Sequence, residues 1–196
     1  MLRDGDAAPL FSARDLNGRR VTLGDCYGYP VMVAFYRAAA CPLSNLRLWY
    51  LLHRHGRFYR HVLRLIVLFD SDLPHAHQYL DRFETDVPLI AARGQEVDDR
   101  YHQLSSLPKA VTTRLTRRRT YEEARYAGVG ARTVLESLRT FDGHRSLLPT
   151  ELLLMPNLEI ARAHYGRDPG DFLPISEIDQ FVLQYMRFPT SPSLSL

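Results

Sequence analysis

The chain has 196 residues, of which 45% are hydrophobic and 24% charged, with a formal net charge of +3. This length suits one domain with its own core, and the small charge gives no reason to expect nucleic acid or an anionic membrane as partner. The sequence has no run of about 18 apolar residues, so no transmembrane helix is expected, and it starts without the apolar stretch of a secretory signal. We therefore expect one domain over 1–188, a disordered tail over 189–196 and a cytoplasmic location.

Strands and helices alternate over the first half of the chain. In chain order, the expected elements are strands over 10–13, 20–23, 31–36, 62–69 and 87–91, and helices over 42–55, 74–83 and 95–104. The continuous apolar run over 31–36 predicts a strand buried on both faces. Pro88 predicts that its strand lies at a sheet edge or begins there. This alternation indicates an α/β fold with a partly parallel sheet.

The second half interrupts the alternation and then resumes it. We interpret the arginine-rich segment over 106–146 as a helical insertion, because it has too few apolar residues for a core of its own. A hairpin of strands over 150–155 and 158–164 follows. Ser176 is expected to cap a last amphipathic helix.

Cys41 points most directly to chemistry. It follows the buried strand over 31–36 and three alanines, and Pro42 and a helical pattern come directly after it. Such a thiol lies at the N-terminus of a helix, where backbone N–H groups and the helix dipole stabilise a thiolate. Because the thiolate is the reactive form of cysteine, the sequence predicts redox or nucleophilic chemistry.

Four stretches resemble the AhpC/TSA peroxiredoxin-like proteins of the thioredoxin superfamily, and most closely the selenoprotein L-related redox proteins. They are residues 5–11 (GDAAPLF), 35–37 (FYR) with 41–48 (CPLSNLRL), 148–150 (LPT) and 164–171 (HYGRDPGD). The resemblance implies a thioredoxin-like fold, a central mixed sheet flanked by helices, here with the helical insertion. It implies no metal and no organic cofactor.

The resemblance also assigns a substrate groove beside Cys41. Pro149 matches the cis-proline that faces the active-site cysteine in thioredoxin-like proteins, with an ordinary trans proline as the alternative. Pro42, Pro149 and Thr150 are expected to shape the groove. Arg37 is expected to stabilise the Cys41 thiolate, the alternative being a solvated or carboxylate-paired arginine.

The chain departs from the family pattern C-x-x-C, because Ser44 stands at the second position. Cys41 cannot close a disulfide there, so a sulfenic acid or mixed disulfide on it needs another thiol. Ser44 is expected to keep a hydrogen bond to the thiolate. Cys26 is the only internal candidate for a resolving thiol, and its loop is expected at the other end of the sheet, which argues against pairing.

Peroxiredoxins bind peroxide with a hydroxyl residue three positions before the thiol and an arginine at a later strand. Here Ala38 and Leu148 stand at those positions. The first hypothesis is a one-cysteine redox protein that reduces a peroxide or disulfide through Cys41, with a small thiol or a thioredoxin-like protein as reductant. The others are a redox-inactive protein-binding module and a monothiol that exchanges with glutathione disulfide. A homodimer is left open.

Overall fold

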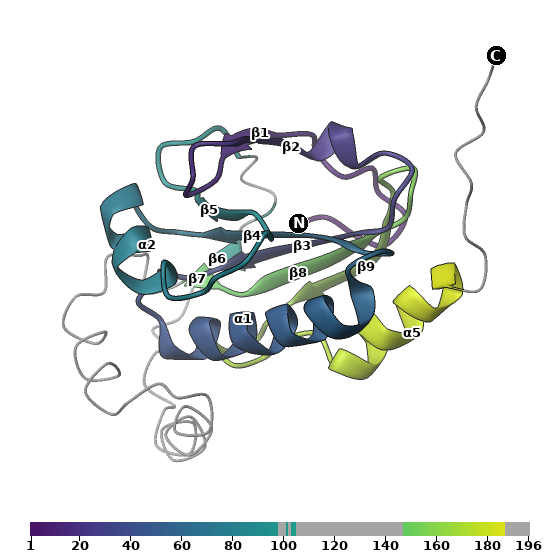
Figure 1. Cartoon of the computed structure of the whole chain (residues 1–196). Coiled ribbons are helices and arrows are strands. Elements are labelled where there is room, and N and C mark those ends of the chain that lie inside the picture. Colours follow the sequence, from purple (N-terminus) through teal and green to yellow (C-terminus); the bar gives the residue numbers. More distant parts are fainter. Residues whose placement is uncertain (98–100, 102, 105–146, 187–196) are drawn as a thin grey trace.

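The structure is a computed structural model that describes residues 1–97, 101, 103–104 and 147–186. Its centre is a five-stranded sheet with the order β5-β4-β3-β8-β9 (Figure 1). The strands are β3 (Val31–Tyr36), β4 (Arg64–Phe69), β5 (Leu89–Ala91), β8 (Thr150–Leu154) and β9 (Ile160–Tyr165). β3, β4 and β5 are parallel, whereas β8 is antiparallel to both β3 and β9. The predicted mixed sheet is therefore confirmed.

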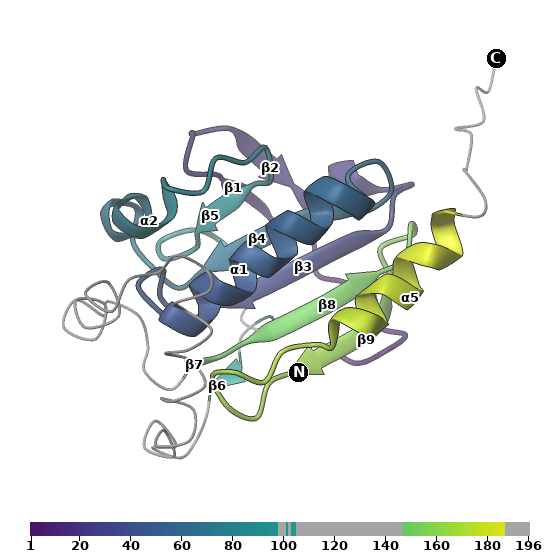
Figure 2. The same ribbon diagram turned by 60° about the horizontal axis from the view of Figure 1, so that its bottom comes forward.

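Three helices contribute to the core on one face of the sheet. They are α1 (Pro42–Arg54), α2 (Leu73–Leu80) and α5 (Ile175–Met186), and α1 and α5 lie side by side across that face (Figure 2). The alternate residues Met32 and Ala34 belong to this core, while Val31 and Val33 belong to the other. β3 is thus buried on both faces, as its apolar run predicts.

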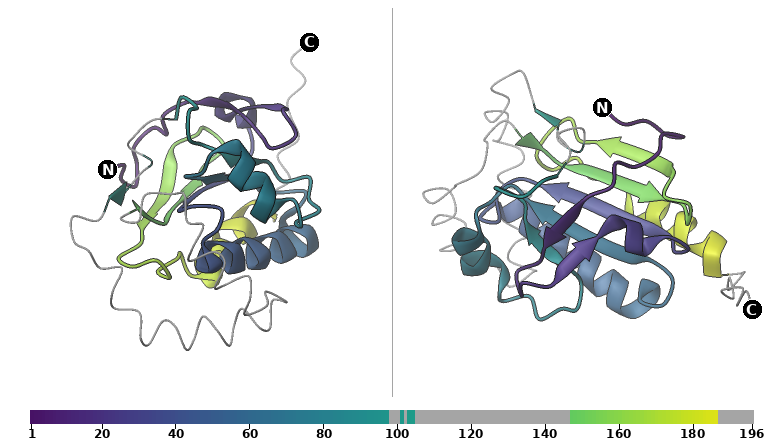
Figure 3. Two further views of the ribbon diagram at one scale, coloured as in Figure 1. Left: turned by 90° about the vertical axis from the view of Figure 1, so that its left-hand side faces the viewer. Right: turned by 90° about the horizontal axis from the view of Figure 1, so that it is seen from above.

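The other face is covered by the N-terminal part of the chain. The hairpin of β1 (Ser12–Arg14) and β2 (Arg20–Thr22) and the 3₁₀ turn η1 (Leu23–Cys26) lie over it (Figure 3). None of the helices in the described part of the chain has the length and apolar character that crossing a bilayer requires. The predicted insertion over 106–146 and the predicted tail over 189–196 lie outside the described residues.

The helix predicted over 95–104 is wrong at 95–97 and at 103–104, while Tyr101 has 3₁₀-helical conformation. Gln103–Leu104 form the short strand β6, which pairs antiparallel with β7 (Leu147–Leu148). The side chain of Gln95 bonds to the backbone of Arg14, as its Oε1 accepts from the amide at 2.6 Å and its Nε2 donates to the carbonyl at 3.0 Å. This long-range contact with β1 takes the place of a helical turn.

The expected cap of the last helix is also wrong. α5 begins at Ile175, so Ser176 lies inside its first turn. The carbonyl oxygen of Pro174 accepts from the amides of Glu177 at 3.0 Å and Ile178 at 3.4 Å. Proline suits the start of a helix because its fixed φ is already helical. The other elements predicted within the described residues are present, and β5 is an edge strand, as Pro88 predicts.

Candidate redox site

Cys41 lies directly after the central strand, at the N-terminal cap of α1. Its amide donates to the carbonyl oxygen of Ala38 at 2.9 Å, and its own carbonyl accepts from the amide of Asn45 at 3.0 Å, which begins the helix. Pro42 occupies the first turn of α1, where its missing N–H leaves no helical bond unmade. Only 4% of the Cys41 surface is exposed, so the thiol sits beneath the surface of the loop.

Two buried polar side chains fix the loop before Cys41. The Nδ2 amide of Asn45 donates to the carbonyl oxygens of Ala39 at 2.5 Å and Cys41 at 2.9 Å. The hydroxyl of Ser71, in the loop after β4, accepts from the amide of Ala39 at 2.7 Å. Arg82 donates in turn to Asn45 Oδ1 at 2.9 Å. Sequence reasoning missed these residues, although a polar Asn45 in an apolar helical run is a usable signal.

Strand pairing brings the predicted groove residues to the same end of the sheet as Cys41. Phe35 lies opposite Thr150 in the antiparallel pair of β3 and β8, so Pro149 is at the end of β3 from which the Cys41 loop leaves. The described residues contain no cis peptide bond, so the cis expectation for Pro149 is wrong. Here the trans proline carries an extended backbone from β7 directly into β8.

The structure explains why the HYGRDPGD stretch has a glycine at position 166. Its amide donates to the carbonyl oxygen of Pro149 at 2.9 Å. A Cβ atom on Gly166 would lie 2.7 Å from Pro149 Cγ and 2.5 Å from the carbonyl oxygen of Asp171. Both distances are shorter than real Cβ contacts, so only glycine allows this turn to pack against Pro149.

A buried ion pair ties α1 to β8 next to these residues. Arg47 donates through Nε and Nη2 to the two carboxylate oxygens of Glu151, both at 2.8 Å. The Tyr36 hydroxyl also donates to Glu151, and the backbone of Leu173 bonds to both partners, with its amide donating to Glu151 at 2.8 Å and its carbonyl accepting from Arg47 at 2.7 Å. Each of the two Glu151 carboxylate oxygens therefore accepts two hydrogen bonds, as a buried carboxylate requires.

The close contacts within this network determine the protonation states of Tyr36 and Arg47. Burial raises the pKa of Tyr36 well above its ordinary value, and the adjacent Glu151 carboxylate raises it further. Burial alone would lower the pKa of Arg47, but the same carboxylate outweighs burial and raises it. Tyr36 thus stays neutral and Arg47 stays charged. Glu151 was detectable in the sequence, because a carboxylate inside a run of buried strand residues requires a partner.

Thr150 faces away from this network. Its side chain shares the strand face of Leu152 and Leu154, which belong to the core under the N-terminal hairpin. Its hydroxyl is buried and makes no hydrogen bond with any described residue. The role of Thr150 in a substrate groove stays a prediction.

The two remaining residues predicted to stabilise the Cys41 thiolate are Ser44 and Arg37, and both are buried. Ser44 is buried in the first turn of α1, and no hydrogen bond among the described residues joins its hydroxyl to Cys41. Arg37 is buried directly after β3. Their effects on a thiolate stay predictions. Residues 1–97, 101, 103–104 and 147–186 contain no group of three or more metal-binding side chains.

The two cysteines are free thiols at opposite ends of β3, because Cys26 ends η1 before the strand and Cys41 follows it. Burial raises the pKa of Cys26, which the nearby Arg64 partly offsets. A thiol with a raised pKa forms little thiolate at neutral pH. Resolution of Cys41 by Cys26 would need movement across the length of the strand, and it stays a prediction.

A cysteine at the start of the helix that follows the central strand of a mixed sheet defines a class, the thiol proteins of the thioredoxin fold. The chain belongs to the AhpC/TSA family, whose sequence profile matches residues 5–122, more than half of its length. The comparison with curated proteins gives no match.

Solved structures with the same fold include thiol oxidoreductases and peroxidases. The thioredoxin domain of a Bacteroides vulgatus thiol-disulfide oxidoreductase has a TM-score of 0.53 at 19% identity, over 93% of this chain and 99% of that one. A thiol peroxidase from Chromobacterium violaceum has a TM-score of 0.55 at 13% identity, over 95% and 89%. A peroxidoxin from Mycobacterium tuberculosis has a TM-score of 0.55 at 13% identity, over 97% and 100%. At these identities, the likeness establishes the fold.

Proposed function

We propose that the protein is a one-cysteine thiol oxidoreductase, in which Cys41 reduces a peroxide or a disulfide and an external thiol regenerates it. The observation that carries this proposal is the position of Cys41 at the N-terminus of α1 in a chain of the AhpC/TSA family. The N–H groups of the first helical turn and the helix dipole favour negative charge on the sulfur. We further propose kinship with the selenoprotein L-related redox proteins and a cytoplasmic location, where thiol reductants are available.

With peroxide, the Cys41 thiolate attacks one oxygen, the O–O bond breaks, and the leaving hydroxide takes up a proton to become water. The product is a sulfenic acid on Cys41. An external thiol attacks this sulfur, releases water and forms a mixed disulfide. A second thiol attacks the mixed disulfide, which restores the Cys41 thiol and releases the oxidised reductant as a disulfide. With a disulfide substrate, the first step is thiol–disulfide exchange at Cys41.

The need for an external thiol follows from what surrounds Cys41. Ser44 occupies the position where a C-x-x-C pair has its second thiol. Cys26 lies at the far end of β3, and burial raises its pKa. A small thiol or a thioredoxin-like protein is therefore the proposed reductant.

Mass spectrometry of trapped sulfenic acid tests this proposal. Wild type, Cys26→Ser and Cys41→Ser are treated with mild hydrogen peroxide and dimedone. We expect an adduct on Cys41 in wild type and in Cys26→Ser, and turnover of peroxide with dithiothreitol in both. Absence of any Cys41 adduct in folded wild type would contradict the proposal, and loss of turnover in Cys26→Ser would contradict the external thiol.

A redox-inactive binding module is the second candidate function. It is favoured by the 4% exposure of Cys41 and by Ala38, which stands where peroxiredoxins have a hydroxyl residue. In that case, Cys41 stays unmodified by both peroxide and oxidised glutathione. A glutathione adduct on Cys41 without peroxide turnover would instead support the monothiol exchange protein.

A further inference from the structure

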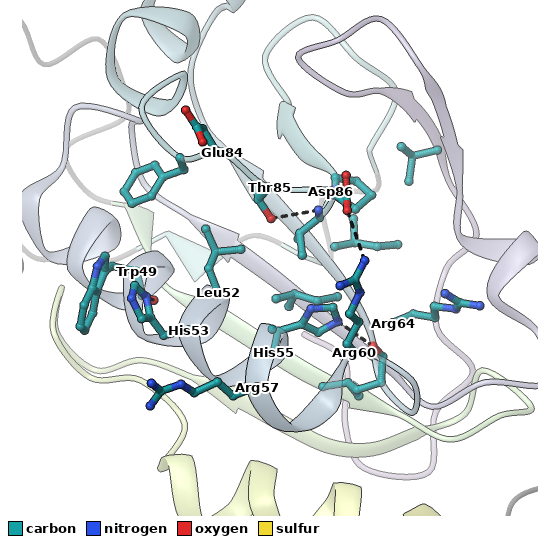
Figure 4. Close-up of a pocket in the computed structure, with 18 of the residues that line it drawn as sticks. Trp49, Leu52, His53, His55, Arg57, Arg60, Arg64, Glu84, Thr85 and Asp86 are labelled. Carbon is teal, nitrogen blue, oxygen red and sulfur yellow. Dashed lines mark hydrogen bonds and ion pairs between the residues drawn. The ribbon is translucent and has the colours of Figure 1, made fainter.

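A second concave site lies at the end of α1 away from Cys41. The cavity has a volume of about 850 Å³ and is walled by the last turns of α1, the turn η2 (His55–Tyr59), the start of β4 and the segment 82–88 (Figure 4). This volume is in the range of sites that hold a small organic molecule. Cys41 caps the opposite end of the same helix, and Arg82, which lines the cavity, is the residue that links it to Asn45 beneath the Cys41 loop.

The turn η2 gives this end of α1 an unusual geometry. It is a π-helical turn that continues directly from the α-helix. Such turns are rare and occur frequently at functional sites, because the inserted residue widens the helix. Here the turn brings His55, Gly56 and Arg57 to the cavity wall, and Arg60 follows immediately.

The cavity carries an excess of positive charge. Its lining includes four arginines and two carboxylates, namely Arg57, Arg60, Arg64, Arg82, Glu84 and Asp86. The ion pair of Arg60 with Asp86 is long, at 3.8 Å, between side chains that are 65% and 95% exposed. Such an exposed pair contributes little and leaves Arg60 available to another anion. Arg57 makes no ion pair with any described carboxylate, and Arg64 lies over the ring of Tyr29 at 4.3 Å.

Half-buried apolar side chains line the same cavity. Trp49, Leu52 and Phe83 are each partly exposed on its wall. A ligand that covered them would bury apolar surface, which stabilises a complex by about 25 cal/mol per Å² before the costs of association. A free inorganic anion would leave these surfaces wet, and an uncharged apolar molecule would leave the arginines unused.

His55 adds a polar group without adding charge. Its Nε2 N–H donates to the carbonyl oxygen of Leu63 at 2.9 Å, because a carbonyl only accepts. Burial lowers the pKa of His55, and the hydrogen bond to Leu63 only partly offsets this. The ring is therefore neutral at pH 7, so His55 adds no positive charge to the site.

We propose that this cavity binds a small amphipathic carboxylate, whose acid group pairs with Arg60 and is attracted by the charge of Arg57, and whose apolar body covers Trp49 and Leu52. The combination of exposed guanidinium groups that an anion can reach, apolar walls and adequate volume selects this class of ligand. The proposal is independent of the redox function of Cys41.

The tryptophan fluorescence of the protein, excited selectively over that of tyrosine, reports on this site, because Trp49 is the single tryptophan of the chain and lines the cavity. Decanoate is titrated against wild type, against Arg57→Gln/Arg60→Gln and against Arg3→Gln, which removes an exposed arginine elsewhere on the surface. We expect decanoate to change the Trp49 emission of wild type with saturation. The double variant should weaken binding about tenfold, the value of one lost charge-assisted hydrogen bond, and Arg3→Gln should leave it unchanged.

Decanol, which has the same chain without the charge, is the matched ligand control. Binding of decanol as tight as that of decanoate, or equal decanoate binding by wild type and the double variant, would overturn the proposal. Saturable decanoate binding by Cys41→Ser with wild-type affinity would support a site that stands whether or not Cys41 is redox active. A flat Trp49 titration in wild type would show that decanoate does not enter the cavity, which would also overturn it.

Discussion

Single buried polar side chains hold the Cys41 loop, because the loop has little side-chain volume of its own. Its three alanines are fully buried but offer only methyl groups for packing. The amide of Asn45 and the hydroxyl of Ser71 therefore fix the path of the chain by hydrogen bonds to Ala39 and Cys41. Buried hydrogen bonds of this kind impose one geometry, since any other leaves a polar group unsatisfied.

Glu151→Gln is expected to lower the free energy of unfolding by about 3 kcal/mol, because it leaves the Arg47 guanidinium buried without its counter-charge. Urea unfolding measures the change. The matched control is Glu177→Gln, which removes a half-exposed carboxylate paired with Arg162 at 3.1 Å, and it should cost less than about 1 kcal/mol. Equal losses in the two variants would show that burial of the Arg47–Glu151 pair has no special weight.

The Cys41 site was predictable only where its signals are local. Cys41, Pro42 and the helix behind them are neighbours in sequence, so their arrangement followed from the pattern. The partner of Glu151 is Arg47, more than a hundred positions earlier, and one sequence does not show which of many arginines pairs with a buried carboxylate. The trans bond of Pro149 was missed for a related reason, since the resemblance assigned an isomer that the chain between β7 and β8 does not adopt.

At the scale of elements, the docking of α5 depends on a polar contact with the end of α1. Asp179 of α5 accepts from the Tyr59 hydroxyl and from Arg54, whose Nε lies 3.2 Å from Oδ1. Burial alone would raise the pKa of Asp179, but these two donors outweigh burial and lower it. Burial and the bond to Asp179 raise the pKa of Tyr59 to about 12.

This contact predicts a loss of stability at alkaline pH. Because the folded pKa of Tyr59 exceeds the ordinary value of 10.0, its stabilisation is complete below pH 10 and is lost as the pH rises toward about 12. The melting temperature of wild type should therefore fall more steeply over this range than that of Tyr59→Phe, which has no phenol to ionise. Parallel pH profiles of the two proteins would contradict the prediction.

Elements with a clear period were predicted correctly, and elements made by distant pairing were not. The apolar runs of β3 and β4 and the amphipathic pattern of α1 can be recognised from the local sequence alone. The two-residue strand β6 exists only because Gln103–Leu104 meet Leu147–Leu148, and strands this short have no readable alternation. Ser176 was a valid capping residue, but α5 begins before it, at Ile175, and the carbonyl of Pro174 accepts the first hydrogen bonds of the helix.

At the scale of the whole molecule, the sheet separates two cores that are covered in different ways. Helices cover one face, whereas the N-terminal segment and the hairpin β1–β2 cover the other. The ring of Phe11 packs edge to face against Tyr101 at 5.7 Å, and the Tyr101 hydroxyl donates to the carbonyl of Pro9 at 2.6 Å. The N-terminal segment is thus a structural layer of the fold.

Phe11→Ala is expected to lower the free energy of unfolding by about 3 kcal/mol, because it opens a cavity under this layer. The adjacent Leu10→Ala is the control, since Leu10 is 67% exposed whereas Phe11 is 5% exposed. Denaturant unfolding should show a large loss for the first variant and almost none for the second. Similar losses for both would mean that the N-terminal layer adds no core.

Because Cys41 is buried, its oxidation is expected to change the conformation of the surrounding loop. Only 4% of the Cys41 surface is exposed, and Ala38 and Ala39 of the same loop are wholly buried. An oxygen atom added to so deeply buried a sulfur is expected to crowd the loop and strain its hydrogen bonds to Asn45 and Ser71. Oxidation of the Cys41 sulfur would thereby change the surface of the loop, and a second protein could bind the oxidised and reduced forms with different affinity.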